Sequence, residues 1–129
     1  MSLTQFGSVI SFAIKLETRL AEFYGQNSKD GGIHSEELNR RAQACLIRKR
    51  KLEQSRRLNV TEIILESIEG LNETDYQLGW TTATSEAINF IEETASRFYG
   101  NAAPKINVLE SHRIFERFRK EHSSLTSLV

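Results

Sequence analysis

Apolar residues recur every three or four positions along most of the chain, which is the spacing of one face of an α-helix. The first such segment carries Phe6, Leu16 and Tyr24 on one broad apolar face. The segments of this kind predict long helices at about 4–27, 35–58, 85–99 and 104–124, and a short crossover helix at about 60–71. We therefore predict an all-α fold, a four-helix bundle that forms one domain over residues 1–129 and has a longer central crossover connection.

Polar and special residues mark where these helices begin and end. Ser35 followed by two acidic residues is typical of a helix N-terminus. Gly100 is expected to stop the third helix, and Pro104 fits the first turn of the fourth. Trp80 lies in the connection, where we expect it to fill the end of the bundle; an exposed indole would instead indicate a contact site.

The composition excludes several classes of protein. The chain has 129 residues, 17 Lys plus Arg, 17 Asp plus Glu and one cysteine, Cys45. One cysteine excludes an internal disulfide framework and a multi-cysteine metal site, and Cys45 reads as a small buried apolar residue. No apolar run reaches the roughly 18 residues of a membrane span, and the N-terminus lacks the features of a signal peptide. We expect a cytoplasmic protein that does not bind membranes.

Charge that cancels over the whole chain is strongly segregated along it. Eight basic residues and one acidic residue give residues 39–57 a net charge of +7, whereas residues 58–96 hold eight acidic residues and no Lys, Arg or His. One of these charged segments can bind a partner of opposite charge, or the two segments can lie against each other within the fold or across a dimer interface. Binding of a nucleic acid or another acidic partner through 39–57 is one hypothesis. A nucleic acid is disfavoured, because the cations lie all round the helix and the pI is about 6.8.

The first and third predicted helices contain an internal repeat. With an offset of 75 residues, both helices contain an aliphatic residue, Glu, five further residues and then Phe-Tyr-Gly, so Glu17 matches Glu92 and Tyr24 matches Tyr99. Seven residues are nearly two helical turns, so each Glu and its Tyr share the apolar face. A buried carboxylate must be protonated, hydrogen-bonded, paired with a cation or bound to a metal.

In these residues the chain resembles the ferritin-like superfamily, and specifically its rubrerythrin-like branch. The resemblance implies a ferritin-like up-down four-helix bundle around a di-iron centre. It also implies that Glu17 and Glu92 match the single carboxylate ligands and that Tyr24 and Tyr99 match neighbouring tyrosines of the family.

The family also carries a Glu-x-x-His motif on each of the second and fourth helices, and this chain has none. Lys49 and His122 align with the family's histidines, and Arg119 with a glutamate. We therefore expect Lys49 and Arg119, with His122, to form a buried ion-pair network with Glu17, Glu92, Tyr24 and Tyr99 in place of the metal. The alternatives are that Lys49 and Arg119 extend to the surface, or that Glu17, Glu92 and His122 still bind one metal ion.

Three functional hypotheses follow. The first is a ferritin-like bundle without a functional di-iron centre, which acts as a structural or protein-interaction module and forms a homodimer or binds another protein. The second is a rubrerythrin-like metal-binding or redox protein with a reduced ligand set. The third is the binder of nucleic acid or another acidic partner. We expect no catalytic activity and no cofactor; if the chain is an enzyme, the resemblance implies an iron-dependent oxidoreductase.

Overall fold

The computed structural model describes residues 6–29, 34–58, 71–106 and 109–126, and these ranges contain helices and connections but no strand. Most of their residues lie in the helices α1 Phe6–Ser28, α2 Ser35–Leu58, α3 Ser85–Ala102 and α4 Leu109–Ser123. The short 3-10 helices η2 Glu73–Tyr76 and η3 Ala103–Lys105 precede α3 and α4. The predicted all-α class and its four long helices are confirmed for this part of the chain.

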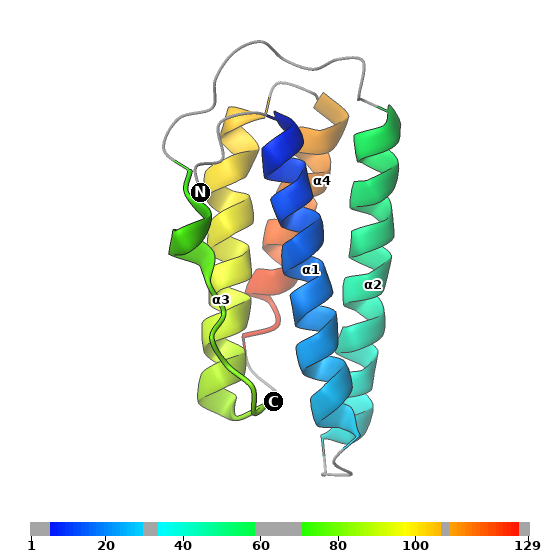
Figure 1. Ribbon diagram of the computed structural model, residues 1–129, viewed down its shortest axis with the longest axis vertical. Helices are drawn as coiled ribbons and strands as arrows, with labels where there is room; N and C mark the ends of the chain where they lie inside the picture. The colour runs from blue at the N-terminus through cyan, green and yellow to red at the C-terminus, as the bar shows by residue number, and fades with distance from the viewer. Residues whose placement is uncertain (1–5, 30–33, 59–70, 107–108, 127–129) are drawn as a thin grey trace.

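Figure 1 shows the directions of the four helices. In this view α1 descends, α2 ascends beside it, α3 also ascends and α4 descends. α1 packs mainly on α2, and α3 packs mainly on α4, whereas smaller contacts of α1 with α3 and of α2 with α4 join the two pairs. α2 and α3 therefore lie at diagonally opposite corners of the bundle and run in the same direction.

Two predicted helix boundaries are wrong. α3 continues past Gly100 to Ala102, and α4 begins at Leu109, five residues after Pro104, which belongs to η3. A glycine ends a helix through its left-handed conformation, but among the described residues only Gly79 has a positive φ, of 70°. The predicted start at residue 4 and nearly all of the crossover helix at 60–71 lie outside the described residues.

The connection from Leu71 to Thr84 leads the chain to the start of α3. It runs along the outside of α3 in Figure 1. Tyr76 of η2 anchors it, since its ring lies 6.2 Å from that of Phe12 on α1 and 5.2 Å from that of Phe98 on α3. Near α3, the Asn27 side-chain amide donates to the Thr81 carbonyl oxygen at 3.0 Å.

The core fills the space between the helices with aliphatic and aromatic side chains. Fully buried examples from the four helices are Leu20, Leu52, Phe98 and Phe115. No helix within the described ranges combines the length and the apolar composition that a membrane span requires. At mid-height the apolar core is interrupted by charged side chains, and these form the candidate site.

Candidate functional site

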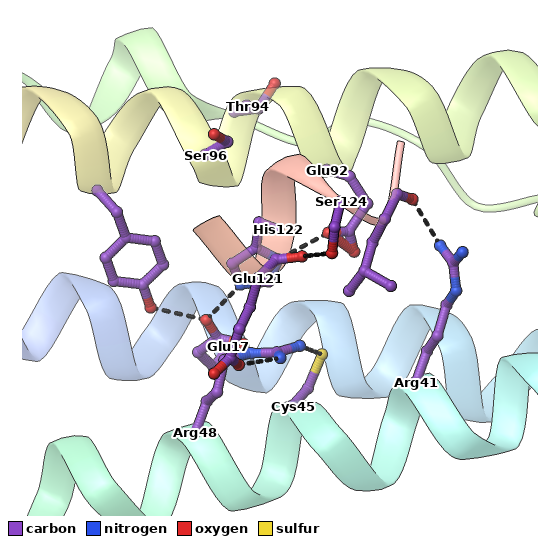
Figure 2. Close-up of polar contacts among 12 residues, drawn as sticks. Glu17, Arg41, Cys45, Arg48, Glu92, Thr94, Ser96, Glu121, His122 and Ser124 are labelled. Atoms are coloured by element: carbon purple, nitrogen blue, oxygen red, sulfur yellow. Dashed lines mark hydrogen bonds and ion pairs between the residues drawn. The ribbon is translucent and has the colours of Figure 1, made fainter. Parts of the chain in front are cut away.

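Two glutamates from equivalent positions of the repeat face each other inside the bundle. Glu17 on α1 and Glu92 on α3 both have no exposed surface. Figure 2 shows both side chains extending from their helices into the space between them. The sequence pattern therefore located the two buried carboxylates, and what neutralises them decides the chemistry of the site.

The imidazole of His122, on α4, lies between the two carboxylates (Figure 2). Its Nε2 is 2.7 Å from Oε2 of Glu17, and its Nδ1 is 2.6 Å from Oε2 of Glu92. A carboxylate oxygen only accepts, so both ring nitrogens must carry a proton to satisfy both contacts. His122 is thus an imidazolium that bridges the two acids, and it has no exposed surface.

Each tyrosine of the repeat donates to the glutamate of the opposite helix. The Tyr24 hydroxyl on α1 donates to Oε1 of Glu92 at 2.7 Å, and the Tyr99 hydroxyl on α3 donates to Oε2 of Glu17 at 2.7 Å. The spacing within each helix predicted that the Glu and Tyr would share a face. The pairing of each Tyr with the Glu of the other helix depends on how α1 and α3 pack in the bundle. The Tyr99 ring also stacks on His122, with centroids 5.7 Å apart and planes 6° apart.

The cation that α2 brings to the site is Arg48, which sequence reasoning missed. Its Nε donates to Oε1 of Glu17 at 3.0 Å, and its Nη1 donates to Oε1 of Glu121 on α4 at 3.0 Å. Its Nη2 lies 3.3 Å from the buried Cys45 Sγ, one helical turn away. The Arg48 side chain is 5% exposed, so this is a buried ion pair with a full set of partners.

The expected roles of Lys49 and Arg119 need correction. Lys49 is half-buried and follows Arg48 on α2, and it is Arg48 that reaches the carboxylates. Arg119 is 36% exposed and pairs with Glu116, one turn away on α4, at 3.5 Å. Both side chains are partly exposed, unlike the fully buried Glu17 and Glu92.

Arg41 completes the network at its edge. Its Nη1 donates to the Tyr24 hydroxyl at 3.3 Å and to the Leu125 carbonyl oxygen at 2.8 Å, and its Nε pairs with Glu37 at 3.0 Å. The bond to Leu125 ties the chain beyond α4 to α2. Arg41 was not among the predicted site residues, since nothing in the sequence separates it from the other arginines of α2.

These contacts shift the pKa of both charged partners. Burial alone would raise the pKa of Glu17, but the charge and hydrogen bond of His122 and the charge of Arg48 outweigh it and lower the pKa to about 2. Burial alone would lower the pKa of His122, but Glu17 and Glu92 outweigh it and raise the pKa to about 9. Glu17 and His122 therefore both stay charged at neutral pH.

The neutral members of the site stay protonated. Burial and the nearby carboxylates raise the pKa of Tyr24 and of Tyr99, so both phenols remain hydrogen-bond donors. Burial and the charge of Glu17 also raise the pKa of Cys45, which is the opposite of what a nucleophilic thiol requires. Within the described residues, every buried side-chain nitrogen and oxygen has a hydrogen-bond partner.

Glu17, Glu92 and His122 do not fit a metal site as they are arranged. The imidazolium stands where an ion would have to contact both carboxylates, and its two nitrogens carry protons instead of free lone pairs. No group of three or more His, Cys, Asp or Glu residues in the described ranges has a geometry that could hold a metal ion. All three side chains are also fully buried, so a substrate could not reach them without opening of the bundle.

No protein-family model matches this chain, and no significant match is found among curated proteins or solved structures.

Proposed function

We propose that this chain is a ferritin-like bundle with an ion-pair network in the place of the family's di-iron centre. In this proposal it acts as a structural or protein-interaction module and not as an iron-dependent oxidoreductase. One observation carries the proposal: the two nitrogens of a single imidazole lie 2.6 and 2.7 Å from oxygens of the two glutamates that would otherwise bind iron.

The arrangement of the helices supports the same proposal. A ferritin-like site takes one glutamate from each of the first and third helices and further ligands from the second and fourth. Here Glu17 and Glu92 come from α1 and α3, while α2 contributes Arg48 and α4 contributes His122. The cations thus come from the two helices that carry the Glu-x-x-His motifs in the family.

The network favours a structural role over catalysis. Two carboxylates face two cations, so the inner group of charges is balanced, and both acids are held by hydrogen bonds. A catalytic acid or base needs access to a substrate and a pKa near the working pH. Glu17 has no exposed surface and a pKa of about 2, so it meets neither condition.

Metal analysis tests the proposal directly. We expect protein produced in iron-supplemented medium and purified without chelators to contain far less than one iron per chain by elemental mass spectrometry. We also expect it not to accelerate the oxidation of added Fe²⁺ by oxygen or hydrogen peroxide. Stoichiometric iron or rapid oxidation would overturn the proposal.

A His122→Ala variant distinguishes the two roles of His122 by the direction in which metal binding changes. If the imidazolium excludes metal, its removal leaves two carboxylates facing each other, and the variant should bind more divalent metal than the wild-type protein. If His122 is instead a metal ligand, the variant should bind less. Far-ultraviolet circular dichroism checks that the variant is still helical.

A further inference from the structure

The outward face of α2 carries a regular stripe of basic and amide side chains around one exposed aliphatic residue. Its members follow one another at alternating steps of three and four residues, so they form a single ridge along the helix. They are Arg40, Gln43, Ile47, Arg50, Gln54 and Arg57, all exposed, and we call them the basic stripe. Ile47 is 50% exposed, which places an apolar contact point at the middle of the stripe.

The stripe is hollowed toward the C-terminal end of α2. Arg50, Gln54 and Arg57 line a surface depression of about 360 Å³ together with Glu53 and Arg56. Guanidinium groups around a depression favour an aromatic ring, because a cation is attracted to the face of the ring. Acidic side chains next to that ring would pair with the same arginines.

The outward side of α3 offers these two chemical groups. Trp80, in the connection, and Phe90, on α3, are 38% and 42% exposed, and their ring centroids are 6.2 Å apart. Glu86 and Glu93 lie exposed four residues before and three residues after Phe90, on the same ridge of the helix. We call Trp80, Phe90, Glu86 and Glu93 the aromatic patch; its two charged members are acidic. Arg97 lies next to Phe90 and Glu93, where it donates to the Asp75 carbonyl oxygen at 2.6 Å, and Arg19 lies next to Trp80.

We propose that the aromatic patch of one molecule docks on the basic stripe of a second copy of this chain. Aromatic residues and arginines dominate the energetics of protein interfaces, and here they lie on two surfaces of opposite charge. Exposed Trp and Phe side chains held together on a rigid bundle have little flexibility to lose on docking. The inference rests on the proposed role as an interaction module and names the partner.

The geometry makes this contact head-to-tail. α2 and α3 occupy diagonal corners of the bundle and run in the same direction (Figure 1), so the stripe and the patch face opposite ways. A two-fold dimer brings the same surface of both subunits together, but these are two different surfaces. Each bound molecule therefore leaves one stripe and one patch open, and the assembly grows into a chain or closes into a ring.

The test is the mass of the full chain in solution, measured by sedimentation and light scattering from about 1 µM to about 1 mM, the range of weak association. We expect the average mass to rise with concentration beyond that of a dimer. Because opposite charges contribute, raising the salt from about 0.05 M to about 0.5 M should weaken the association several-fold. A wild-type protein that stays monomeric throughout would overturn the inference.

Two variants with one inactive surface each give the sharpest result. Trp80→Ala with Phe90→Ala removes the patch, and Ile47→Glu with Arg50→Glu reverses the stripe; each should be monomeric alone. Mixed in equal amounts, they should form a 1:1 complex and nothing larger, since each contributes its one intact surface. Leu109→Ala, which removes a side chain 60% exposed and outside both surfaces, is the matched control and should associate like the wild type.

The remaining outcomes are also decisive. Variants that associate like the wild type, or a mixture that stays monomeric, would overturn the inference. So would a monomeric wild-type protein that binds mixed DNA or RNA through Arg50, because the stripe would then serve a nucleic acid. Iron analysis of the same samples separates the two proposals: bound iron contradicts the metal-free network, and the mass alone decides self-association.

Discussion

His122 neutralises two acids because its ring nitrogens point in opposite directions and Glu17 and Glu92 lie on opposite sides of it. A lysine at the same place would present a single ammonium group, and an arginine a wider fork. The ring also stacks on Tyr99, which fixes its plane at an angle of 6° to the phenol. A compact, oriented cation therefore sits between the two acids, and its protonation determines whether the site is balanced.

At this scale we expect Glu17→Gln to destabilise the fold by about 3–5 kcal/mol, since it leaves the buried Arg48 and His122 with one carboxylate fewer. Urea unfolding followed by circular dichroism measures the loss. Glu22→Gln, an exposed position on the same helix, is the control and should change the stability by less than about 0.5 kcal/mol. A loss below about 1 kcal/mol for Glu17→Gln would contradict an ionic role for this carboxylate.

The sequence identified five members of the site and misplaced two. Glu17, Glu92, Tyr24 and Tyr99 were visible because the repeat places them on apolar faces, and His122 because it occurs among the phenylalanines of α4. Arg48 was not visible, because Arg48 and Lys49 lie about 60° and about 40° to either side of Cys45 on a helical wheel. The positions of α1 and α4 decide which flank is buried, and no pattern within α2 contains that information.

At the scale of elements, the connection before α3 also contributes a buried side chain, Tyr76, to the core of the bundle. Tyr76 lies between Phe12 and Phe98 and is 3% exposed. Its hydroxyl accepts a hydrogen bond from the Asn101 amide at 2.9 Å, and the Arg97 guanidinium lies 5.5 Å from its ring centre. Sequence reasoning assigned this filling role to Trp80, which the structure instead leaves partly exposed beside Phe90.

We therefore expect Tyr76→Ala to lower the free energy of unfolding by about 3–5 kcal/mol, because it removes a buried aromatic ring from between α1 and α3. Trp80→Ala, in the same connection, should cost less than about 1 kcal/mol, since much of its indole already contacts solvent. Thermal or urea unfolding of the two variants side by side makes the comparison. Equal losses would show that the connection is anchored elsewhere.

Single residues that are typical of helix ends predicted some helix boundaries of this chain and not others. Ser35 with its two following acids located the start of α2 correctly. Gly100 and Pro104 did not mark the end of α3 and the start of α4, because Ala102 and Ala103 keep helical backbone angles. The Arg119 side chain would lie only 3.1 Å from a β-carbon at position 100, so glycine there permits close packing of α4.

At the scale of the whole molecule, each antiparallel pair of helices brings one acid and one cation to the centre. α1 and α2 contribute Glu17 and Arg48, while α3 and α4 contribute Glu92 and His122. Bonds that join the two pairs include those of Tyr24, of Tyr99 and of His122 with Glu17, and that of Arg48 with Glu121. Each pair is thus electrically balanced before docking, and the docked bundle gains hydrogen bonds without adding an unpaired charge.

This arrangement predicts how the stability of the whole bundle depends on pH. The pKa of His122 is about 9 in the folded chain against 6.5 for the free side chain, so its contribution is complete below pH 6.5 and is lost as the pH rises to about 9. The loss should be about 3 kcal/mol. Glu17, with a pKa lowered from 4.5 to about 2, adds a second loss as the pH falls below 4.5.

Urea midpoints measured between pH 2 and pH 10 would trace both limbs. His122→Gln serves as the reference, since it cannot titrate and should remove the alkaline limb; it should also reduce the acidic limb, because His122 is the main cause of the lowered pKa of Glu17. A wild-type protein whose stability is constant between pH 6.5 and pH 9 would contradict an imidazolium at the centre.

The buried network also constrains how this sequence can evolve. Loss of any one charge leaves its partner buried and unpaired, whereas exchange of the whole set for apolar residues can be neutral or favourable. Substitutions that exchange these charged residues for apolar ones are therefore expected to occur in combination, or on a background stable enough to tolerate an intermediate. Among descendants of a common ancestor, positions 17, 48, 92 and 122 are expected to covary, so that each lineage keeps either a complete ionic set or none.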